Sequence, residues 1–195
     1  LCGNKSRKEF TSVEELVDDH FLNYSYENHP CRQSLLTALD MLRNKPANII
    51  ETGSSAWGTN SSLLFDSYVN SFGGSFCSVD IRMKPMVSLI GLCTKKSTFY
   101  CDDSINFLKA IPKNNISMVY LDSSDVDWQD PIQSAIHGFN EFLVILPYLL
   151  PGALLLIDDT PKDMDVMSKV HPEYLNSFEL FQKKYGFSPG KGGLV

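Results

Sequence analysis

The feature that most constrains this chain is a repeated order of short apolar runs and longer amphipathic runs. The apolar runs have the length of strands, and each ends in an acidic or glycine-bearing turn. Such strands are expected at residues 48–53, 75–81, 97–101, 116–121 and 153–157. Strands that alternate with helices favour a parallel sheet that is covered by helices on both faces. The predicted fold class is therefore α/β, with one doubly wound, mostly parallel sheet.

The amphipathic runs place helices between these strands, at residues 60–72, 85–92, 104–111 and 130–149. Before the first strand, Thr11-Ser12 predicts a helix start, and residues 31–43 carry leucines at helical spacing. A further helix is expected at residues 172–184. No repeat or linker divides the chain, so we predict a single domain over residues 1–195. Residues 1–45 would be helices that cap the site, and residues 46–195 would be the sheet core.

The two ends of the sequence suggest a trimmed piece of a longer protein. The chain does not begin with Met, and its first residues lack the apolar core of a signal peptide. Residues 185–187 resemble the beginning of a strand, and residues 190–195 resemble a turn that runs into a second strand, cut short by the end of the sequence. We therefore expect an antiparallel hairpin that is truncated at the C-terminus.

Composition and charge exclude several classes of protein. A hydrophobic content of 43% with 21% charged residues excludes a disordered chain. No apolar run reaches the ~18 residues of a membrane span, so no membrane partner is expected. A net charge of −6 argues against a nucleic-acid partner. The five cysteines form no CxxC pair, which favours a reducing compartment and a cytoplasmic location. The sequence leaves a homodimer open.

The turn after the first predicted strand carries the first candidate binding residues. In an open α/β sheet, ligands bind at the carboxyl ends of the strands, where the strand order reverses. Gly53 and Gly58 let the backbone turn sharply and approach a ligand closely. Ser54 and Ser55 add hydrogen-bonding side chains near the start of the next helix. On their own, these residues are equally compatible with ordinary loop chemistry.

Acidic residues end the next two predicted strands. Asp80 is placed to accept both hydroxyls of a ribose, and a partnership with Arg82 is the alternative. Asp102 and Asp103 follow the third strand. Asp103 can cap the helix that begins near Ser104 and can also face an adenine edge.

The ordered set of these turns resembles the class I S-adenosylmethionine-dependent methyltransferases. That family has an E-x-G-x-x-x-G turn, then an acidic residue, then a D-[AS] pair, then an LLxPGG run that leads into the fifth strand. The matching segments of this chain are Glu51-x-Gly53, Asp80, Asp103-Ser104, and Pro151 to Asp159. The likeness covers about residues 31 to 160.

The resemblance implies a Rossmann-like sheet and an enzyme of the EC 2.1.1 class. Such an enzyme would move a methyl group from S-adenosylmethionine to a small-molecule acceptor, and we expect a hydroxyl oxygen. The methionine end of the cofactor would lie against Glu51, Gly53 and Ser55, although a carboxylate at the first of these positions more often supports the turn than touches the ligand. The implied cofactor residues are Glu51, Gly53, Ser54, Ser55, Gly58, Asp80, Ile81, Asp102, Asp103, Ser104 and Asp122.

Three carboxylates are expected to converge at one edge of the sheet. Asp122 ends the fourth strand, and Asp158 and Asp159 end the fifth. Like charges packed together are costly unless a cation or a proton lies between them. Oxygen ligands favour Mg²⁺, Ca²⁺ or Mn²⁺. The arrangement is similar to that of catechol-type and macrocin-type O-methyltransferases, which implies Mg²⁺ on all three carboxylates, with Asp122 and Asp158 as catalytic residues.

Two departures from those families leave the general base unassigned. The catechol-type enzymes carry a lysine three residues after the first metal-binding Asp, where this chain has Asp125. The macrocin-type enzymes carry a D-G-x-H-x-Y run, where this chain reads Asp122-Ser123-Ser124-Asp125-Val126-Asp127. Alternatively, Asp122 and Asp158 face the acceptor without a metal, or simply end their strands.

Two other functions stay open at this stage. One is a nicotinamide-dependent oxidoreductase on a similar sheet, although the chain lacks both GxGxxG and a Tyr-x-x-x-Lys pair. The other is a module that binds S-adenosylmethionine without catalysis. The sequence does not identify the acceptor.

Overall fold

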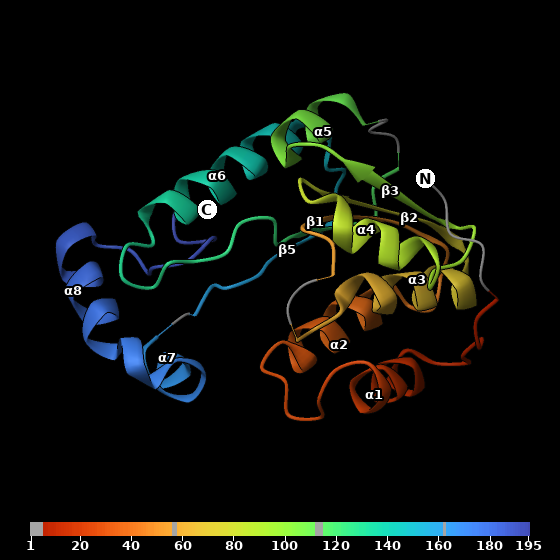
Figure 1. Cartoon of the computed structure of the whole chain (residues 1–195), viewed down its shortest axis with the longest axis horizontal. Coiled ribbons are helices and arrows are strands. Elements are labelled where there is room, and N and C mark those ends of the chain that lie inside the picture. The colour runs from red at the N-terminus through yellow and green to blue at the C-terminus, as the bar shows by residue number, and fades with distance from the viewer. Residues whose placement is uncertain (1–5, 56–57, 112–114, 162) are drawn as a thin grey trace.

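The sheet has five strands, all parallel, with helices on both faces (Figure 1). The computed structural model describes residues 6–55, 58–111, 115–161 and 163–195. The strand order is β3-β2-β1-β4-β5. The strands are β1 (Ala47–Thr52), β2 (Gly74–Asp80), β3 (Ser97–Cys101), β4 (Met118–Leu121) and β5 (Leu154–Ile157). The predicted doubly wound α/β sheet is confirmed, because chain order runs outward from β1 in one direction and from β4 in the other.

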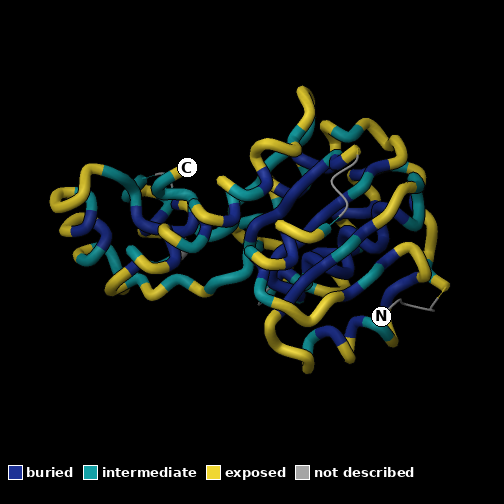
Figure 2. Tube along the Cα trace, turned by 90° about the horizontal axis from the view of Figure 1, so that it is seen from above, coloured by how far each residue is buried: buried dark blue, intermediate teal, exposed yellow. Residues whose placement is uncertain are grey.

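Two helical layers enclose the sheet. The first consists of α1 (Val13–Asn23), α2 (Arg32–Met41), α3 (Ser61–Phe72) and α4 (Met83–Ile90), and the second of α5 (Ser104–Ala110) and α6 (Ile132–Ile145). Successive strand side chains point to opposite faces. Ile49 therefore packs in the core under the first layer, and Ile50 packs under the second. Buried residues are concentrated in the sheet and in the helices that cover it (Figure 2).

A smaller helical lobe follows β5. It contains α7 (Met164–Val170), the 3₁₀ turn η2 (Pro172–Tyr174) and α8 (Leu175–Tyr185), and it lies beside the sheet rather than on either face (Figures 1 and 2). The structure confirms the expected helix at residues 172–184, although α7 was not predicted. The predicted helix over residues 130–149 ends earlier, at Ile145, and continues as the 3₁₀ turn η1 (Leu146–Tyr148) around Pro147.

The predicted closing hairpin is absent from the described structure, because residues 185–195 contain no strand. The chain instead turns back towards the ends of β4 and β5. The Lys191 amide donates to the Asp159 carbonyl at 3.3 Å, and the Gly192 amide donates to Thr160 Oγ1 at 3.1 Å. These backbone groups pair with the loop after β5, not with a sheet edge, which is why the expected strands do not form. No helix in the described residues has both the length and the apolar character needed to cross a membrane.

Candidate active site

The site lies at the switch point of the sheet, between the carboxyl ends of β1 and β4. Gly53 follows β1 with a φ of 83°. A Cβ atom at this position would lie 2.0 Å from the Asp122 carbonyl oxygen. Glycine is therefore required here because the backbone after β4 comes so close. The predicted sharp turn is present, and the close approach that requires glycine is to the protein backbone after β4.

A cavity of about 850 Å³ opens over this switch point, and we call it the larger cavity. It extends across the ends of β1, β2, β4 and β5. The predicted residues on its wall are Gly53, Ser54, Ser55, Asp80, Ile81, Asp122, Asp158 and Asp159. Several of these residues are carboxylates, so the cavity suits a ligand that carries positive charge. Ala56 and Trp57, in the same turn, lie outside the described residues.

Asp80 is almost completely buried and already has partners. Its carboxylate accepts the Ser54 amide at 3.1 Å and the Arg82 amide at 2.7 Å. Arg82 also donates Nε and Nη2 to the two carboxylate oxygens, each at 3.0 Å. The alternative partnership with Arg82 is therefore confirmed. A ribose at Asp80 would have to displace this guanidinium, whose side chain is 64% exposed and free to move aside.

Glu51 lies beneath the turn, outside the wall of either cavity described here. Its fully buried carboxylate accepts hydroxyl hydrogen bonds from Ser61 at 2.6 Å, Ser62 at 2.5 Å and Ser78 at 2.6 Å. Burial raises the pKa of Glu51 to about 7, although the three serines oppose the rise. Glu51 thus holds the start of α3 against the sheet, which agrees with the supporting role expected from the sequence, and its contact with the cofactor stays a prediction.

Gly58 also faces protein rather than cavity. Its carbonyl accepts the Ser25 hydroxyl at 2.5 Å, and a Cβ atom there would lie 3.4 Å from both His29 and Tyr26. The position therefore joins the first turn to the segment between α1 and α2. Its predicted role in cofactor binding stays a prediction.

The three residues after β3 do not line either cavity. Asp103 caps α5 by accepting the Asn106 amide at 3.0 Å, so the capping alternative is confirmed. Asp102 is exposed and accepts the Asp103 amide at 2.8 Å. Ser104 is buried and lies 3.1 Å from His137 Nε2. The contact of Asp103 and Ser104 with the adenine stays a prediction.

Ser104 belongs to a polar network that the sequence did not reveal. Ser123 Oγ lies 2.9 Å from His137 Nε2 and donates to Glu141 Oε1 at 2.7 Å. Glu141 is almost fully buried, and its carboxylate, 3.7 Å from His137 Nε2, raises the pKa of His137. The one available signal was the i,i+4 spacing of His137 and Glu141 on α6. The network anchors the loop after β4 to α5 and α6.

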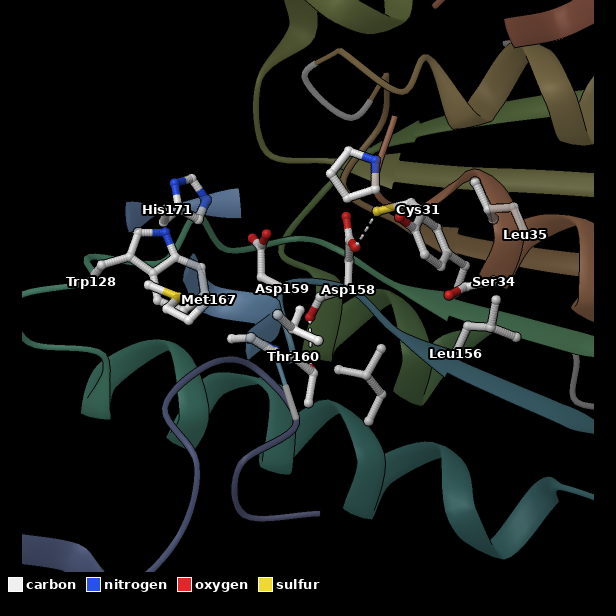
Figure 3. A pocket seen from close by; sticks show the side chains of 15 residues that line it. Cys31, Ser34, Leu35, Trp128, Leu156, Asp158, Asp159, Thr160, Met167 and His171 are labelled. Carbon is white, nitrogen blue, oxygen red and sulfur yellow. Dashed lines mark hydrogen bonds between the residues drawn. The ribbon is translucent and has the colours of Figure 1, made fainter. Parts of the chain in front are cut away.

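A second cavity of about 230 Å³ lies between α2, the end of β5 and α7 (Figure 3), and we call it the smaller cavity. Its walls are largely apolar, with Leu35, Leu156 and Met167 among them. Four residues line both cavities, which places the two side by side at the end of β5: Trp128, Asp158, Asp159 and His171. The rings of Trp128 and His171 lie 5.1 Å apart and form one wall of this junction.

Asp158 is the carboxylate at the junction. Cys31 Sγ, at the start of α2, donates to Asp158 Oδ1 at 3.1 Å (Figure 3). The Tyr120 hydroxyl interacts with Asp158 but has no hydrogen-bond partner of normal geometry among the described residues. Because Tyr120 is buried and lines the smaller cavity, its hydroxyl is available to a ligand there. Neither Cys31 nor Tyr120 carried a recognisable signal in the sequence.

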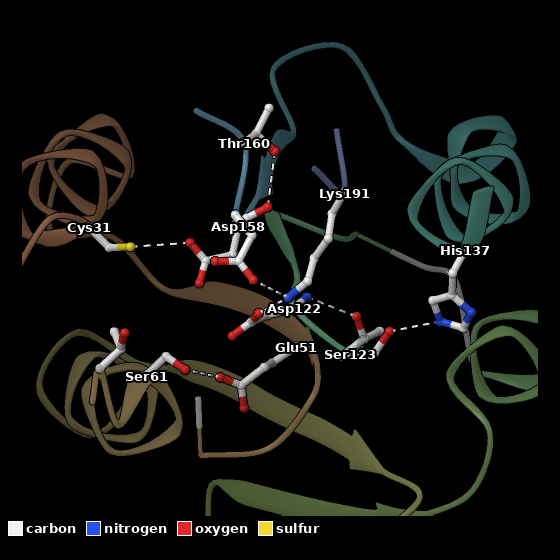
Figure 4. Close-up of polar contacts among 12 residues, drawn as sticks. Cys31, Glu51, Ser61, Asp122, Ser123, His137, Asp158, Thr160 and Lys191 are labelled. Atoms are coloured by element: carbon white, nitrogen blue, oxygen red, sulfur yellow. Dashed lines mark hydrogen bonds and ion pairs between the residues drawn. The ribbon is translucent and has the colours of Figure 1, made fainter. Parts of the chain in front are cut away.

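A lysine lies among the carboxylates of the predicted metal site (Figure 4). Lys191 Nζ donates a hydrogen bond to Asp122 Oδ1 and lies 3.1 Å from Asp159 Oδ2. Burial lowers the pKa of the Lys191 ammonium, but Asp122 and Asp159 raise it by more, so the net shift is upward. Burial and Asp158 raise the pKa of Asp122 well above its usual range, and Lys191 opposes that rise.

The three carboxylates therefore converge as predicted, but they do not fit a divalent cation as they are placed. In the described part of the chain, no group of three or more His, Cys, Asp or Glu side chains is arranged to hold a metal. An ammonium that contacts both Asp122 and Asp159 takes up the space and the lone pairs that a metal would use. The sequence predicted a turn and a strand at residues 190–195 and assigned no role to Lys191.

Comparison with known proteins gives a match by structure only. No family model matches the chain, and no curated protein is significantly similar to it. The MycE methyltransferase from the mycinamycin biosynthetic pathway, in complex with Mg, SAH and mycinamycin VI, is 19% identical with a TM-score of 0.55. The alignment covers 83% of this chain and 39% of that one. A crystal form of MycE with Mg and SAH is 18% identical with a TM-score of 0.56, and the alignment covers 91% of this chain and 47% of that one.

A third match is a Staphylococcus aureus protein that is assigned as a caffeoyl-CoA O-methyltransferase. It is 14% identical with a TM-score of 0.50, and the alignment covers 92% of this chain and 86% of that one. The present chain spans less than half the length of the MycE chains. At these identities the likeness is one of fold: the chain shares a Rossmann-like α/β sheet with these methyltransferase structures.

Proposed function

We propose that this chain transfers a methyl group from S-adenosylmethionine to a hydroxyl oxygen of a small molecule. The observation that carries the proposal is the junction of two cavities at Asp158, Asp159, Trp128 and His171. A reaction between two bound ligands needs such a junction, because the reacting atoms must come within about 3–3.5 Å of each other. When bound, S-adenosylmethionine supplies a methyl group that is already activated by its positively charged sulfur.

The larger cavity is the proposed cofactor site. Its carboxylates complement the sulfonium and amino groups, and its position at the switch point is where α/β sheets bind nucleotides. Asp80 would hold the ribose once Arg82 moves away. Ile81, which is 74% exposed on the same wall, would offer apolar contact to the adenine.

The smaller cavity is the proposed acceptor site. Its apolar walls favour a mostly apolar molecule, and the aromatic side of the junction favours a flat one. Its polar lining includes Asp158 and the Tyr120 hydroxyl, which interacts with that carboxylate. An acceptor hydroxyl would therefore point to Asp158, towards the larger cavity.

Asp158 is the best candidate to hold the proton that the acceptor loses. Asp122 and Asp158 were both predicted to be catalytic. Asp122, however, is bound to Lys191 and lines only the larger of the two cavities. Asp158 lines both cavities, accepts a hydrogen bond from Cys31 and interacts with the Tyr120 hydroxyl, and it has no cation as a partner in the contacts described above. Positioned proton transfer contributes typically 10²–10⁴-fold to a rate, and the remainder would come from alignment of the two ligands.

The structural neighbours support the proposed class of cofactor and of acceptor. The MycE structures contain SAH and Mg, and one contains mycinamycin VI, a small molecule. The fold shared with them is compatible with a nicotinamide cofactor as well, so the choice between cofactors depends on the carboxylate-rich cavity. A pyrophosphate would be repelled by those carboxylates.

The first test is calorimetric titration with S-adenosylmethionine and S-adenosylhomocysteine, followed by assay of S-adenosylhomocysteine formation with a panel of hydroxylated aromatic acceptors. We expect micromolar binding of both ligands and turnover with at least one acceptor. Asp158→Asn should keep cofactor binding and lower the turnover by ~10²–10⁴-fold, whereas the exposed Asp165→Asn should match wild type. Binding without turnover on any acceptor would indicate the non-catalytic module, and binding of NADH alone would indicate the oxidoreductase.

We propose a cytoplasmic location as well. The cysteines within the described residues, Cys31, Cys77, Cys93 and Cys101, are all free, as expected in a reducing compartment. The absence of a nucleic-acid partner stays a prediction from the net charge. A homodimer also stays open, and sedimentation equilibrium would decide it.

A further inference from the structure

Lys191 occupies the centre of the carboxylate cluster as a fully enclosed cation. Lys191 is only 2% exposed. Its ammonium contacts carboxylates that follow two different strands, Asp122 after β4 and Asp159 after β5. Figure 4 shows the Lys191 side chain entering from the C-terminal segment and reaching Asp122. A lysine is rarely buried unless it is paired, so this contact is a specific feature of the fold.

Three glycines make room for the backbone that carries Lys191. A Cβ atom on Gly138 of α6 would lie 2.3 Å from the Lys191 carbonyl oxygen. On Gly190, with a φ of 117°, it would lie 2.1 Å from the Asp159 carbonyl oxygen, and on Gly192 it would lie 2.7 Å from Thr160 Oγ1. The neighbouring elements are therefore shaped to accept the segment, which fixes where the ammonium lies.

The ammonium satisfies the same electrostatic need as a divalent cation. Asp122, Asp158 and Asp159 bring three like charges to the ends of β4 and β5, and such a cluster requires a compensating cation or proton. Lys191 supplies one positive charge, shared by two of them. A metal ion at that point would meet a fixed positive charge within bonding distance of its own ligands, so the two cations exclude each other.

We infer that Lys191 takes the place of a divalent cation in this site, so that methyl transfer by this chain proceeds with a lysine ammonium where related folds can hold a metal. The link to methyl transfer rests on the function proposed above, but the exclusion of metal by Lys191 does not. The inference makes Lys191 a positioning residue: it orients Asp122 and Asp159 and leaves Asp158 to face the acceptor.

The test is Mn²⁺ binding to the purified chain without cofactor or acceptor, measured by electron paramagnetic resonance. The wild type should show no stoichiometric binding. Lys191→Met removes the charge while keeping most of the side-chain volume, and it should gain one Mn²⁺ site with affinity at least about tenfold above wild type. Lys191→Arg should stay like wild type because it keeps the cation. Lys95→Met, at an exposed lysine, is the matched control and should gain nothing.

Adding Asp122→Asn to Lys191→Met should abolish the gained site, which would locate it at the cluster. Stoichiometric Mn²⁺ binding by the wild type would overturn the inference, and so would a folded Lys191→Met variant that binds no Mn²⁺. Circular dichroism establishes which variants fold. If Lys191→Met does not fold, the wild-type titration decides alone. Because no methyl transfer is measured, these outcomes are separate from those of the cofactor titration.

Discussion

The charged residues at the strand ends have partners of different kinds, and those partners determine what each can do. Asp80 is paired with an exposed arginine that can leave, Asp122 with a buried lysine that cannot, and Asp158 with a thiol. A carboxylate whose partner is mobile is available to a ligand at little cost. The residue types were therefore less informative than the neighbours that the fold supplies.

Asp80 provides the first prediction at this scale. Asp80→Ala should weaken S-adenosylmethionine binding by about tenfold or more, because lost ribose hydrogen bonds to a charged group cost ~1.5–3 kcal/mol. Arg82→Ala should leave the affinity unchanged or increase it, because the ligand no longer has to displace the guanidinium. Calorimetry on both variants measures this contrast. Equal losses in the two variants would mean that the pair supports the loop and does not bind ribose.

Glu51 provides a prediction about pH. Its pKa is about 7 in the folded protein against an ordinary value of 4.5, so between these pH values the folded protein holds a proton that the unfolded chain releases. The stabilisation is complete below the unfolded pKa and is lost as pH rises through the folded pKa. Because one pKa unit corresponds to about 1.4 kcal/mol, the full loss is about 3 kcal/mol.

Urea unfolding at about pH 5 and about pH 7.5 measures this effect. The free energy of unfolding of wild type relative to Glu51→Gln should fall between the two pH values, because the amide does not titrate. Comparison of the two proteins cancels groups that titrate in both, such as His137. Glu14→Gln, at an exposed position of α1, should show no such difference from wild type. Parallel pH profiles for wild type and Glu51→Gln would contradict the raised pKa.

At the scale of elements, a buried ion pair joins the N-terminal segment to α3. Arg7 Nε lies 3.2 Å from Asp66 Oδ2, and both side chains are at most 10% exposed. The other Asp66 oxygen accepts from the Thr94 amide at 2.9 Å and from the Ser97 hydroxyl at 2.5 Å, at the start of β3. One carboxylate thus connects three segments that are distant in sequence.

Removal of this carboxylate should be strongly destabilising. Asp66→Ala leaves the Arg7 guanidinium buried without a counter-charge, and breaking a buried pair in this way costs about 3–5 kcal/mol. The free energy of unfolding from urea titration should fall by that amount. Asp40→Ala, at an exposed position of α2, should change it by less than about 0.5 kcal/mol. A loss of under about 1 kcal/mol for Asp66→Ala would show that water reaches Arg7.

At the scale of the whole molecule, the larger cavity is lined by segments that are far apart in the sequence, from Gly53 to His171. It includes residues of the first turn, the loop after β4 and His171 of the smaller lobe. A ligand bound there contacts the sheet and the lobe together. Binding should therefore stabilise the entire fold rather than one part of it.

S-adenosylmethionine at 100 times its dissociation constant should raise the free energy of unfolding by about 2.7 kcal/mol. For a chain of this length, that corresponds to an increase in Tm of roughly 5–10 °C. Differential scanning calorimetry measures the increase, and Asp80→Ala at the same ligand concentration should show a smaller one. No change in the Tm of wild type at saturating ligand would contradict the proposed cofactor site.

The parallel sheet and both main helical layers follow from patterns that are local in the sequence. The strand at residues 97–101 and the helix at residues 60–72 match the observed elements to within one residue. Hydrophobic periodicity reports which face of an element is buried, and this depends only on neighbours along the chain. Carboxyl ends of parallel strands meet at one edge, so the convergence of Asp80, Asp122 and Asp158 was also predictable.

The contacts between segments distant in sequence were decided by the tertiary structure. Lys191 lies 69 residues from its partner Asp122, and Cys31 lies 127 residues from Asp158. Nothing in either local sequence specifies such a pairing, because it depends on how the C-terminal segment and α2 pack against the ends of β4 and β5. The sequence by itself thus determined the α/β sheet and the edge where its carboxylates gather. The fold alone decided which cation those carboxylates hold and which of them stays free to meet a ligand.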